Sequence, residues 1–217
     1  MKISKTKRLV ETGLLIAIAV VLSVISKTLP LRLPFGGSIT LLSMLPIVLL
    51  SYRHGVKWGL FSAFVYSLLQ IATGLDVIRA FFIPADYKIT ASLGILLLDY
   101  IVAYTMLGFG GVFRNKIKNP SIALVAGSVV ALMLRYITHI ISGAIFFGAW
   151  AEWFFSQEGF YKIGEKILGT FSGNSLAIIY SIFYNGLYMI PEIIITTIAA
   201  AIVGAVPVIG KKCDLKS

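Results

Sequence analysis

Long apolar stretches, separated by short polar or glycine- and proline-containing segments, occupy most of the chain. Most of them approach or exceed the roughly 20 residues that cross a bilayer as an α-helix. Their continuity excludes the short alternating strands of a transmembrane β-barrel. We therefore predict an all-α integral membrane protein, one domain over residues 1–217, with six transmembrane helices in a single bundle. The expected spans are 9–27, 38–52, 57–74, 89–113, 121–149 and 174–208.

Two spans depart from ordinary length. The second is short and contains Pro46, which is expected to kink it. The last is longer than a bilayer requires, so it is expected to tilt or to project from the membrane.

The basic N-terminus is not followed by a cleavage site of small residues, so the first apolar run is interpreted as a span and not as a signal peptide.

Composition agrees with a lipid environment. Of 217 residues, 58% are hydrophobic and 13% are charged, whereas a soluble domain carries about 25% charged residues. The single cysteine, Cys213, lies in the polar C-terminal tail and cannot form an internal disulfide.

The net charge of +10 is distributed unevenly between the two sets of connections. In a soluble protein it would suggest a nucleic-acid partner; here it indicates juxtamembrane cations that face the cytoplasm and its anionic lipids. We therefore place a multi-pass chain in the cell membrane with both termini cytoplasmic, and expect His54 to be solvated in a basic inner connection. The inner set of cations is Lys2, Lys5, Lys7, Arg8, Arg53, Lys57, Arg114, Lys116, Lys118, Lys211, Lys212 and Lys216. The outer set is Lys27, Arg32, Arg79, Lys88, Lys162 and Lys166.

The outer connections, residues 29–38, 74–88 and 149–174, are long and rich in aromatic residues. Long loops of this kind often close over a binding site. Their aromatic side chains are equally typical of a belt at the headgroup level.

Away from the ends of the predicted spans, at mid-membrane, few side chains are charged or readily ionised: Asp99, Arg135, His139 and Glu192. A charge at this depth costs several kcal/mol unless it is paired or faces a cavity, so each is a functional candidate. Arg135 and His139 are one helical turn apart. Arg135 is expected to pair with Glu192 or with Asp99 as a structural clamp, and His139 is compatible with a hydrogen bond between helices.

Aromatic and polar residues repeat at helical spacing on three spans, which predicts three faces that point toward one another. The residues are Asp99, Tyr100 and Tyr104; Tyr136, His139, Gly143 and Phe147; and Tyr180, Tyr184, Tyr188 and Glu192, with Asn185 beside them.

Such a pocket suits a small, flat ring compound that is cationic or carries an amino group. Aromatic rings stack on flat ligands and attract cations. A carboxylate at Asp99 neutralises positive charge, and the amide of Asn185 both donates and accepts. The alternative for each tyrosine is packing between helices.

Several catalytic patterns are absent from the sequence. There is no phosphate-binding G-x-x-x-x-G-K-[ST], no H-E-x-x-H or other metal-ligand spacing, and no G-x-S-x-G. We therefore expect a binding protein and not an enzyme, with no metal and no cofactor.

The first span contains small residues four positions apart, Gly13 with Ala17 and Ala19 with Ser23. This spacing lets another helix approach closely. The spacing alone does not decide between an internal helix and another subunit.

Four segments carry a resemblance to a known family: "GGSITLLSMLPIVLLSYRHGVKWGL", "LLLDYIVAYTMLGFGGVF", "LRYITHIISGAIFFG" and "IIYSIFYNGLYMIPE". In this order they resemble the thiamine-specific substrate-binding (S) component of energy-coupling factor (ECF) transporters. The resemblance covers all six predicted spans. Differences from the family pattern are Asp99 where members can have glutamate, Phe147 where they can have tryptophan, and a longer connection at 149–174.

The resemblance implies a six-helix subunit that binds thiamine near the outer face and closes over it with the loop between the first two spans. It also implies a separate transmembrane coupling protein and two cytoplasmic ATPases as partners, with Gly13 and Ala17 contacting the coupling protein. The implied substrate-binding residues are Asp99, Tyr100, His139, Phe147, Tyr180 and Asn185, to which the stripe on the last span adds Tyr184.

Three other interpretations remain open from the sequence. The same scaffold could bind another flat vitamin or precursor, such as hydroxymethylpyrimidine. The chain could be an autonomous ion-coupled carrier that uses Asp99, Arg135 and His139 as a relay. It could also be a structural subunit whose polar residues only join helices.

Overall fold

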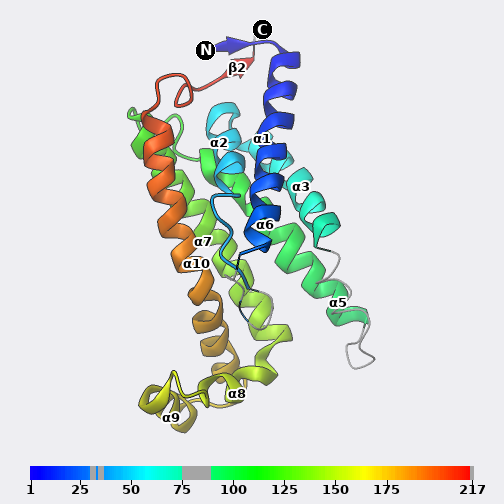
Figure 1. The fold of residues 1–217 in the computed structure, drawn as a ribbon, viewed down its shortest axis with the longest axis vertical. Coiled ribbons are helices and arrows are strands. Elements are labelled where there is room, and N and C mark those ends of the chain that lie inside the picture. The colour runs from blue at the N-terminus through cyan, green and yellow to red at the C-terminus, as the bar shows by residue number, and fades with distance from the viewer. Residues whose placement is uncertain (30–32, 34–36, 75–88, 216–217) are drawn as a thin grey trace.

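A computed structural model describes residues 1–29, 33, 37–74 and 89–215. Within these residues the protein is a bundle of long helices with both termini at one end (Figure 1). At that end β1 (Lys2–Ile3) pairs in parallel with β2 (Asp214–Leu215). At the opposite end lie two short helices, α8 and α9. The expectation that both termini share one side of the bundle agrees with this arrangement.

The predicted spans all contain helix. The helices are α1 (Lys5–Lys27), α2 (Leu45–His54), α3 (Val56–Thr73), α5 (Ile89–Ile95), α6 (Ala103–Thr105), α7 (Pro120–Phe146), α8 (Ala151–Phe155), α9 (Tyr161–Thr170) and α10 (Gly173–Ala205). A π-helical segment, η1 (Leu96–Val102), joins α5 to α6, and 3₁₀ segments form η2 (Met106–Gly111) and η3 (Gly148–Trp150).

Four helical segments of the described chain are long and apolar enough to cross a membrane: Lys5–Lys27, Ile89–Gly111, Pro120–Phe146 and Gly173–Ala205. The predicted count of six is therefore not confirmed. The 10 residues of α2 extend only about 15 Å, roughly half the hydrocarbon thickness.

The second predicted span differs most from expectation. Pro46 does not kink a helix there; it lies at the first helical positions of α2, where its missing N–H costs nothing. The preceding residues, 37–44, have no regular helix. All α2 residues from Leu45 to Arg53 are buried, so this helix is surrounded by protein. Gly55, with φ of +93°, then turns the chain into α3.

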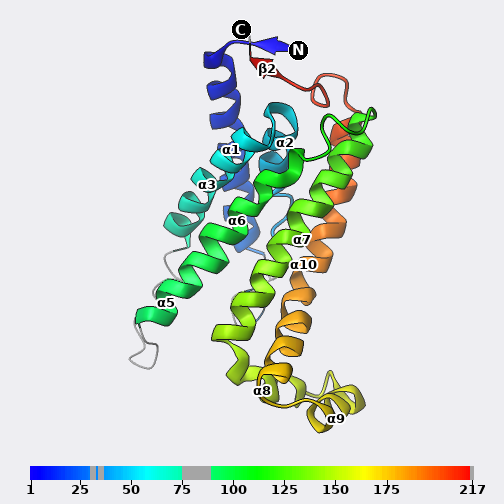
Figure 2. The same cartoon turned by 180° about the vertical axis from the view of Figure 1, so that it is seen from behind.

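The continuous helical rod from Ile89 to Gly111 lies between α3 and α7 (Figure 2). Its last turn packs very closely against α7. A β-carbon at Gly127 of α7 would lie only 1.9 Å from the carbonyl oxygen of Gly110. The two backbones can meet at this point because neither residue has a side chain.

Charged side chains join the tails to the bundle at the end where the termini lie. Arg53 donates to the carbonyl oxygens of Val208, Ile209 and Lys211, and contacts the Glu11 carboxylate of α1. Because the five N–H groups of a guanidinium can satisfy several carbonyls at once, one arginine holds the C-terminal segment against α1 and α2.

His54 is not solvated as expected. Its side chain is fully buried, and Nε2 lies 3.5 Å from Glu11 Oε2. Burial lowers the pKa of His54, with the Glu11 carboxylate opposing the shift. Nearby, a hydrogen bond from Arg114 lowers the pKa of Asp214, an exposed residue of β2. The inner connection is thus a packed polar cluster.

The close approach of Gly127 and Gly110 predicts that any side chain larger than hydrogen at Gly127 destabilises the fold. Gly127→Ala is expected to lower the unfolding midpoint, because overpacking costs about 1–3 kcal/mol when backbones must separate. Gly169→Ala in α9 is the control, since a β-carbon there meets nothing within 4 Å. Thermal unfolding of both variants in detergent measures the difference; an unchanged midpoint for Gly127→Ala would contradict this packing.

Candidate functional site

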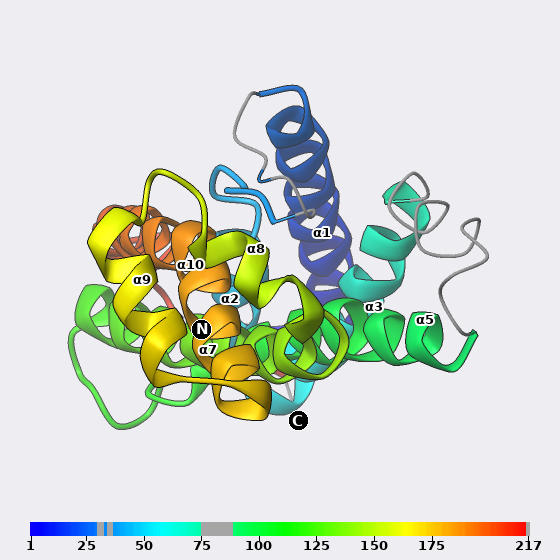
Figure 3. The ribbon, with the colours of Figure 1, turned by 90° about the horizontal axis from the view of Figure 1, so that it is seen from below.

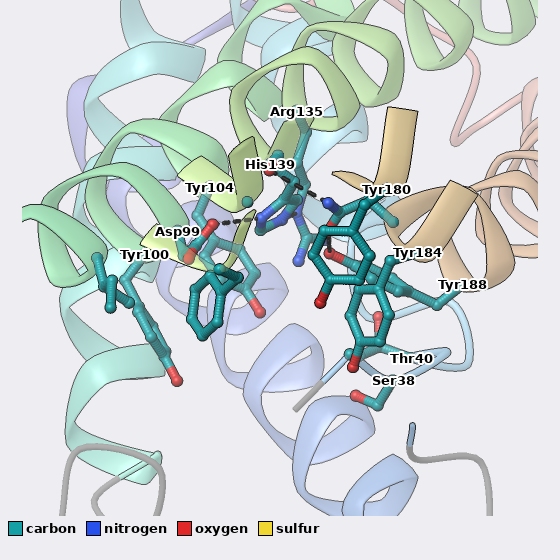
Figure 4. A pocket seen from close by; sticks show the side chains of 15 residues that line it. Ser38, Thr40, Asp99, Tyr100, Tyr104, Arg135, His139, Tyr180, Tyr184 and Tyr188 are labelled. Carbon is teal, nitrogen blue, oxygen red and sulfur yellow. Dashed lines mark hydrogen bonds and ion pairs between the residues drawn. The ribbon is translucent and has the colours of Figure 1, made fainter. Parts of the chain in front are cut away.

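A cavity opens between η1, α7 and α10, with the irregular 37–40 segment as a further wall. Its empty volume, which includes the open mouth, is about 820 Å³. The lining residues are Gly37, Ser38, Thr40, Ile95, Asp99, Tyr100, Tyr104, Arg135, His139, Gly143, Phe147, Tyr180, Tyr184, Asn185 and Tyr188. In Figure 4, Asp99, Tyr100 and Tyr104 lie on one side, and Tyr180, Tyr184 and Tyr188 lie on the other.

The three helical faces predicted from the sequence do meet. All seven predicted substrate-binding residues, Asp99, Tyr100, His139, Phe147, Tyr180, Tyr184 and Asn185, line the cavity. Tyr136 does not; its hydroxyl donates to the carbonyl oxygen of Ile182 on α10 at 2.6 Å, outside the pocket.

Asp99 lies in the π-helical segment η1, a type of irregularity often found at functional sites. Both of its carboxylate oxygens have donors from α7: His139 Nδ1 lies 2.8 Å from Oδ1, and Ser142 Oγ lies 2.8 Å from Oδ2. These two hydrogen bonds give each oxygen of the carboxylate a partner on α7. Its side chain remains 20% exposed, on the side of the cavity.

Arg135 does not pair with either predicted carboxylate. Within the described residues it forms no ion pair with Asp99 or Glu192; its Nε donates to His139 Nε2 at 3.2 Å, one turn along the same helix. Its guanidinium stacks on the Tyr104 ring, 4.2 Å from the centroid. The sequence interpretation of an arginine–carboxylate clamp is therefore wrong, because a neighbouring imidazole and an aromatic face satisfy the guanidinium instead.

Glu192 has a different role from the one expected. It is 1% exposed, and its Oε2 accepts a hydrogen bond of 2.6 Å from the backbone N–H of Thr40. Gly37 packs on the Tyr188 ring of the same helix. Glu192 and Tyr188 thus hold the irregular wall of the cavity against α10.

Asn185 supports the site as well as lining it. Its Nδ2 donates to the carbonyl oxygens of His139 and Ser181, and its Oδ1 accepts from the Tyr188 hydroxyl at 2.5 Å. These bonds join α7 to α10 at the depth of the cavity. The amide is therefore already bonded within the bundle, in addition to facing the pocket.

An aromatic cluster lies behind the tyrosine wall. Phe154 of α8 contacts the rings of Tyr180 and Tyr184, with centroids 5.3 and 5.8 Å away, and stacks on Phe160. Figure 3 shows α8 and α9 over the α7–α10 side of the bundle, away from α3 and α5. The long 149–174 connection thus packs against one wall of the pocket.

Sequence reasoning missed part of the lining. The residues 37–40 carry no periodic signal that would mark them as a wall. Tyr104, Gly143 and Tyr188 lie on the predicted stripes but are not among the predicted binding residues. Arg135 was expected to act as a structural clamp or, in the carrier alternative, in a relay, and not to line a binding pocket.

Comparison with known proteins identifies the family. Residues 9–156 match the family model described as "Thiamine transporter protein (Thia_YuaJ)". The chain belongs to this family. The resemblance seen in the sequence is confirmed at this level, and a transporter family agrees with the expectation that the chain is not an enzyme.

Two curated relatives are both named "Thiamine transporter ThiT". The protein of Bacillus subtilis (strain 168) is 33% identical over 200 residues, covering 88% of this chain and 86% of the relative. The protein of Lacticaseibacillus paracasei is 26% identical over 156 residues, covering 66% and 69% of the two chains.

A solved structure shares the fold. It is ThiT from Listeria monocytogenes, 22% identical, with a TM-score of 0.66 over 98% of this chain and 99% of that one. The overall arrangement of helices is therefore shared with that structure.

The Glu192–Thr40 hydrogen bond is expected to slow amide hydrogen exchange in the irregular wall of the cavity. Glu192→Ala leaves a buried N–H without an acceptor, at a cost of about 1–3 kcal/mol, so amide exchange in residues 37–44 is expected to accelerate. Glu192→Gln retains an acceptor and is expected to stay close to wild type. Hydrogen–deuterium exchange with mass spectrometry measures this, with the exposed Glu165→Ala as control; equal exchange in Glu192→Ala and wild type would refute the role.

Proposed function

We propose that this chain binds thiamine in the cavity between η1, α7 and α10. The observation that carries the proposal is the Asp99 carboxylate: it faces a cavity walled by tyrosines, with its negative charge stabilised by His139 and Ser142. Thiamine is a permanent cation with an aminopyrimidine ring. A half-buried anion surrounded by aromatic faces matches both properties.

Roles follow from position in the cavity. Asp99 supplies the anion, His139 and Phe147 supply stacking surfaces, and Tyr100, Tyr180, Tyr184 and Asn185 supply polar contacts to the rings. The curated relatives, both named as thiamine transporters, support this substrate.

We also infer that α2 and α3 complete a six-helix membrane bundle. The short α2 and the irregular residues 37–44 are tolerated at membrane depth because they are buried in protein or line a cavity. The excess of cations at the end that carries both termini supports a cytoplasmic position for that end, with the cavity opening outward.

Uptake would require an ECF coupling protein and its two ATPases, because this sequence has no phosphate-binding loop. The structure separates the two small-residue pairs of α1. Ala19 and Ser23 are buried, and Ser23 donates to Gln70 of α3. Gly13 and Ala17 face outward, and a β-carbon at Gly13 would meet nothing within 4 Å. This outward face supports a contact with the coupling protein.

Substitution of the anion tests the substrate. Asp99→Asn is expected to weaken thiamine binding more than about tenfold, because it removes the partner of a buried cation, while the neutral hydroxymethylpyrimidine should lose much less. Isothermal titration calorimetry on purified protein measures both. Glu152→Gln, an exposed acid near the outer end, is the charge-matched control. Unchanged thiamine affinity in Asp99→Asn, with the fold retained, would refute the proposed site.

Coupling is tested separately from binding. Gly13→Leu with Ala17→Leu is expected to leave thiamine affinity within about twofold of wild type but to abolish uptake by cells that supply the coupling module, because bulky residues prevent close helix approach. Ile198→Phe, on the exposed face of α10, is the control for added bulk. Wild-type uptake by the double variant, or uptake by this chain alone in liposomes, would contradict the coupling proposal.

A further inference from the structure

An arginine in a pocket proposed for a cation is unexpected. Arg135 is 5% exposed and lines the same cavity as Asp99. Within the described residues no carboxylate lies within ion-pair distance of it, so charge pairing does not explain its presence. Its bond to His139 does offer an explanation.

The hydrogen bonds define where the proton of His139 lies. A guanidinium has only donors, so the 3.2 Å bond from Arg135 Nε requires an unprotonated Nε2 on His139. The imidazole proton is then on Nδ1, which lies 2.8 Å from Asp99 Oδ1 and donates to it. The order of donation is therefore Arg135 to His139 to Asp99.

We propose that Arg135 is a positioning residue that holds His139 in its neutral, Nδ1-protonated form and thereby keeps the negative charge of Asp99 available to a cationic ligand. This inference rests on the proposed function and adds a specific role for Arg135. A proton on His139 Nε2 would face the N–H of Arg135, so that geometry excludes both the other tautomer and the imidazolium. An imidazolium beside Asp99 would neutralise the carboxylate before any ligand arrived.

The guanidinium of Arg135 has two further contacts besides His139. It lies over the Tyr104 ring, and Nη1 contacts Met44 Sδ. The other ring beside His139 is Tyr188 of α10, with centroids 5.9 Å apart, and Asp99 of η1 is the acid that His139 contacts. Arg135, Asp99 and Tyr188 are thus the titratable or charged neighbours that face the imidazole.

Nitrogen NMR tests the proposal without any ligand. The chain has two histidines, so ¹⁵N-histidine labelling gives two sets of ring signals, and His139→Gln identifies those of His139. In wild type, Nδ1 is expected to be protonated and Nε2 unprotonated. In Arg135→Met, which removes the donor at similar length, His139 is expected to show imidazolium signals, because Nε2 can then take up a proton while Nδ1 still donates to Asp99. Arg135→Lys, which retains a cation and a donor, is expected to preserve the Nδ1–H form.

Thiamine titration gives the second readout. Arg135→Met is expected to bind thiamine about tenfold or more weakly, while Thr138→Val is expected to match wild type. Thr138 is a suitable control because it is buried on the same turn and donates to Leu134 O, away from the cavity.

Three results would overturn the proposal: wild-type His139 with its proton on Nε2, unchanged His139 signals in Arg135→Met, or equal thiamine affinity in Arg135→Met and Thr138→Val. The first is read from the wild-type protein, with His139→Gln used only to assign the signals. Because the spectra are recorded without ligand, failure of wild type to bind thiamine would refute the proposed function and leave the tautomer test intact.

Discussion

The structure depends on how one carboxylate is accommodated inside an apolar bundle. Asp99 lies among long helices whose outer surfaces are covered with exposed leucine, isoleucine and valine side chains. An unpaired charge at such depth would cost several kcal/mol. His139 and Ser142 on α7 supply donors to both oxygens, and a cavity opens on the remaining side. The anion is thus stabilised by donors and not by a permanent counter-ion, which leaves its charge for a ligand.

The rest of the architecture positions these groups. A π-helical segment in the fourth predicted span carries Asp99, and the close contact of Gly110 with Gly127 fixes that rod against α7. Asn185 joins α7 to α10 at the same level. Because α2 begins only at Leu45, the preceding residues 37–40 are irregular and form one wall of the cavity. Glu192 holds this wall through its hydrogen bond to Thr40.

Sequence patterns predicted the long helices and the convergence of Asp99, His139 and Asn185, because apolar length and helical spacing determine which residues must avoid lipid. They predicted a short second span but not that its helix begins only at Leu45, since residues 38–44 were expected to be helical and instead pack as irregular chain. The pairing of Arg135 was also wrong. Spacing indicates which face a side chain occupies, but the choice between an acid and a neighbouring imidazole depends on distances that only the folded chain defines.

The central claim of the proposed function is that the Asp99 carboxylate meets the cationic ligand directly. Infrared difference spectroscopy on protein labelled with ¹³C-carboxylate aspartate tests this, since the chain has four aspartates and Asp99→Asn identifies the band. We expect thiamine to shift an isotope-sensitive carboxylate stretch that is missing in Asp99→Asn. A protonated carboxylic acid band for Asp99, or an aspartate spectrum that thiamine leaves unchanged, would contradict the account.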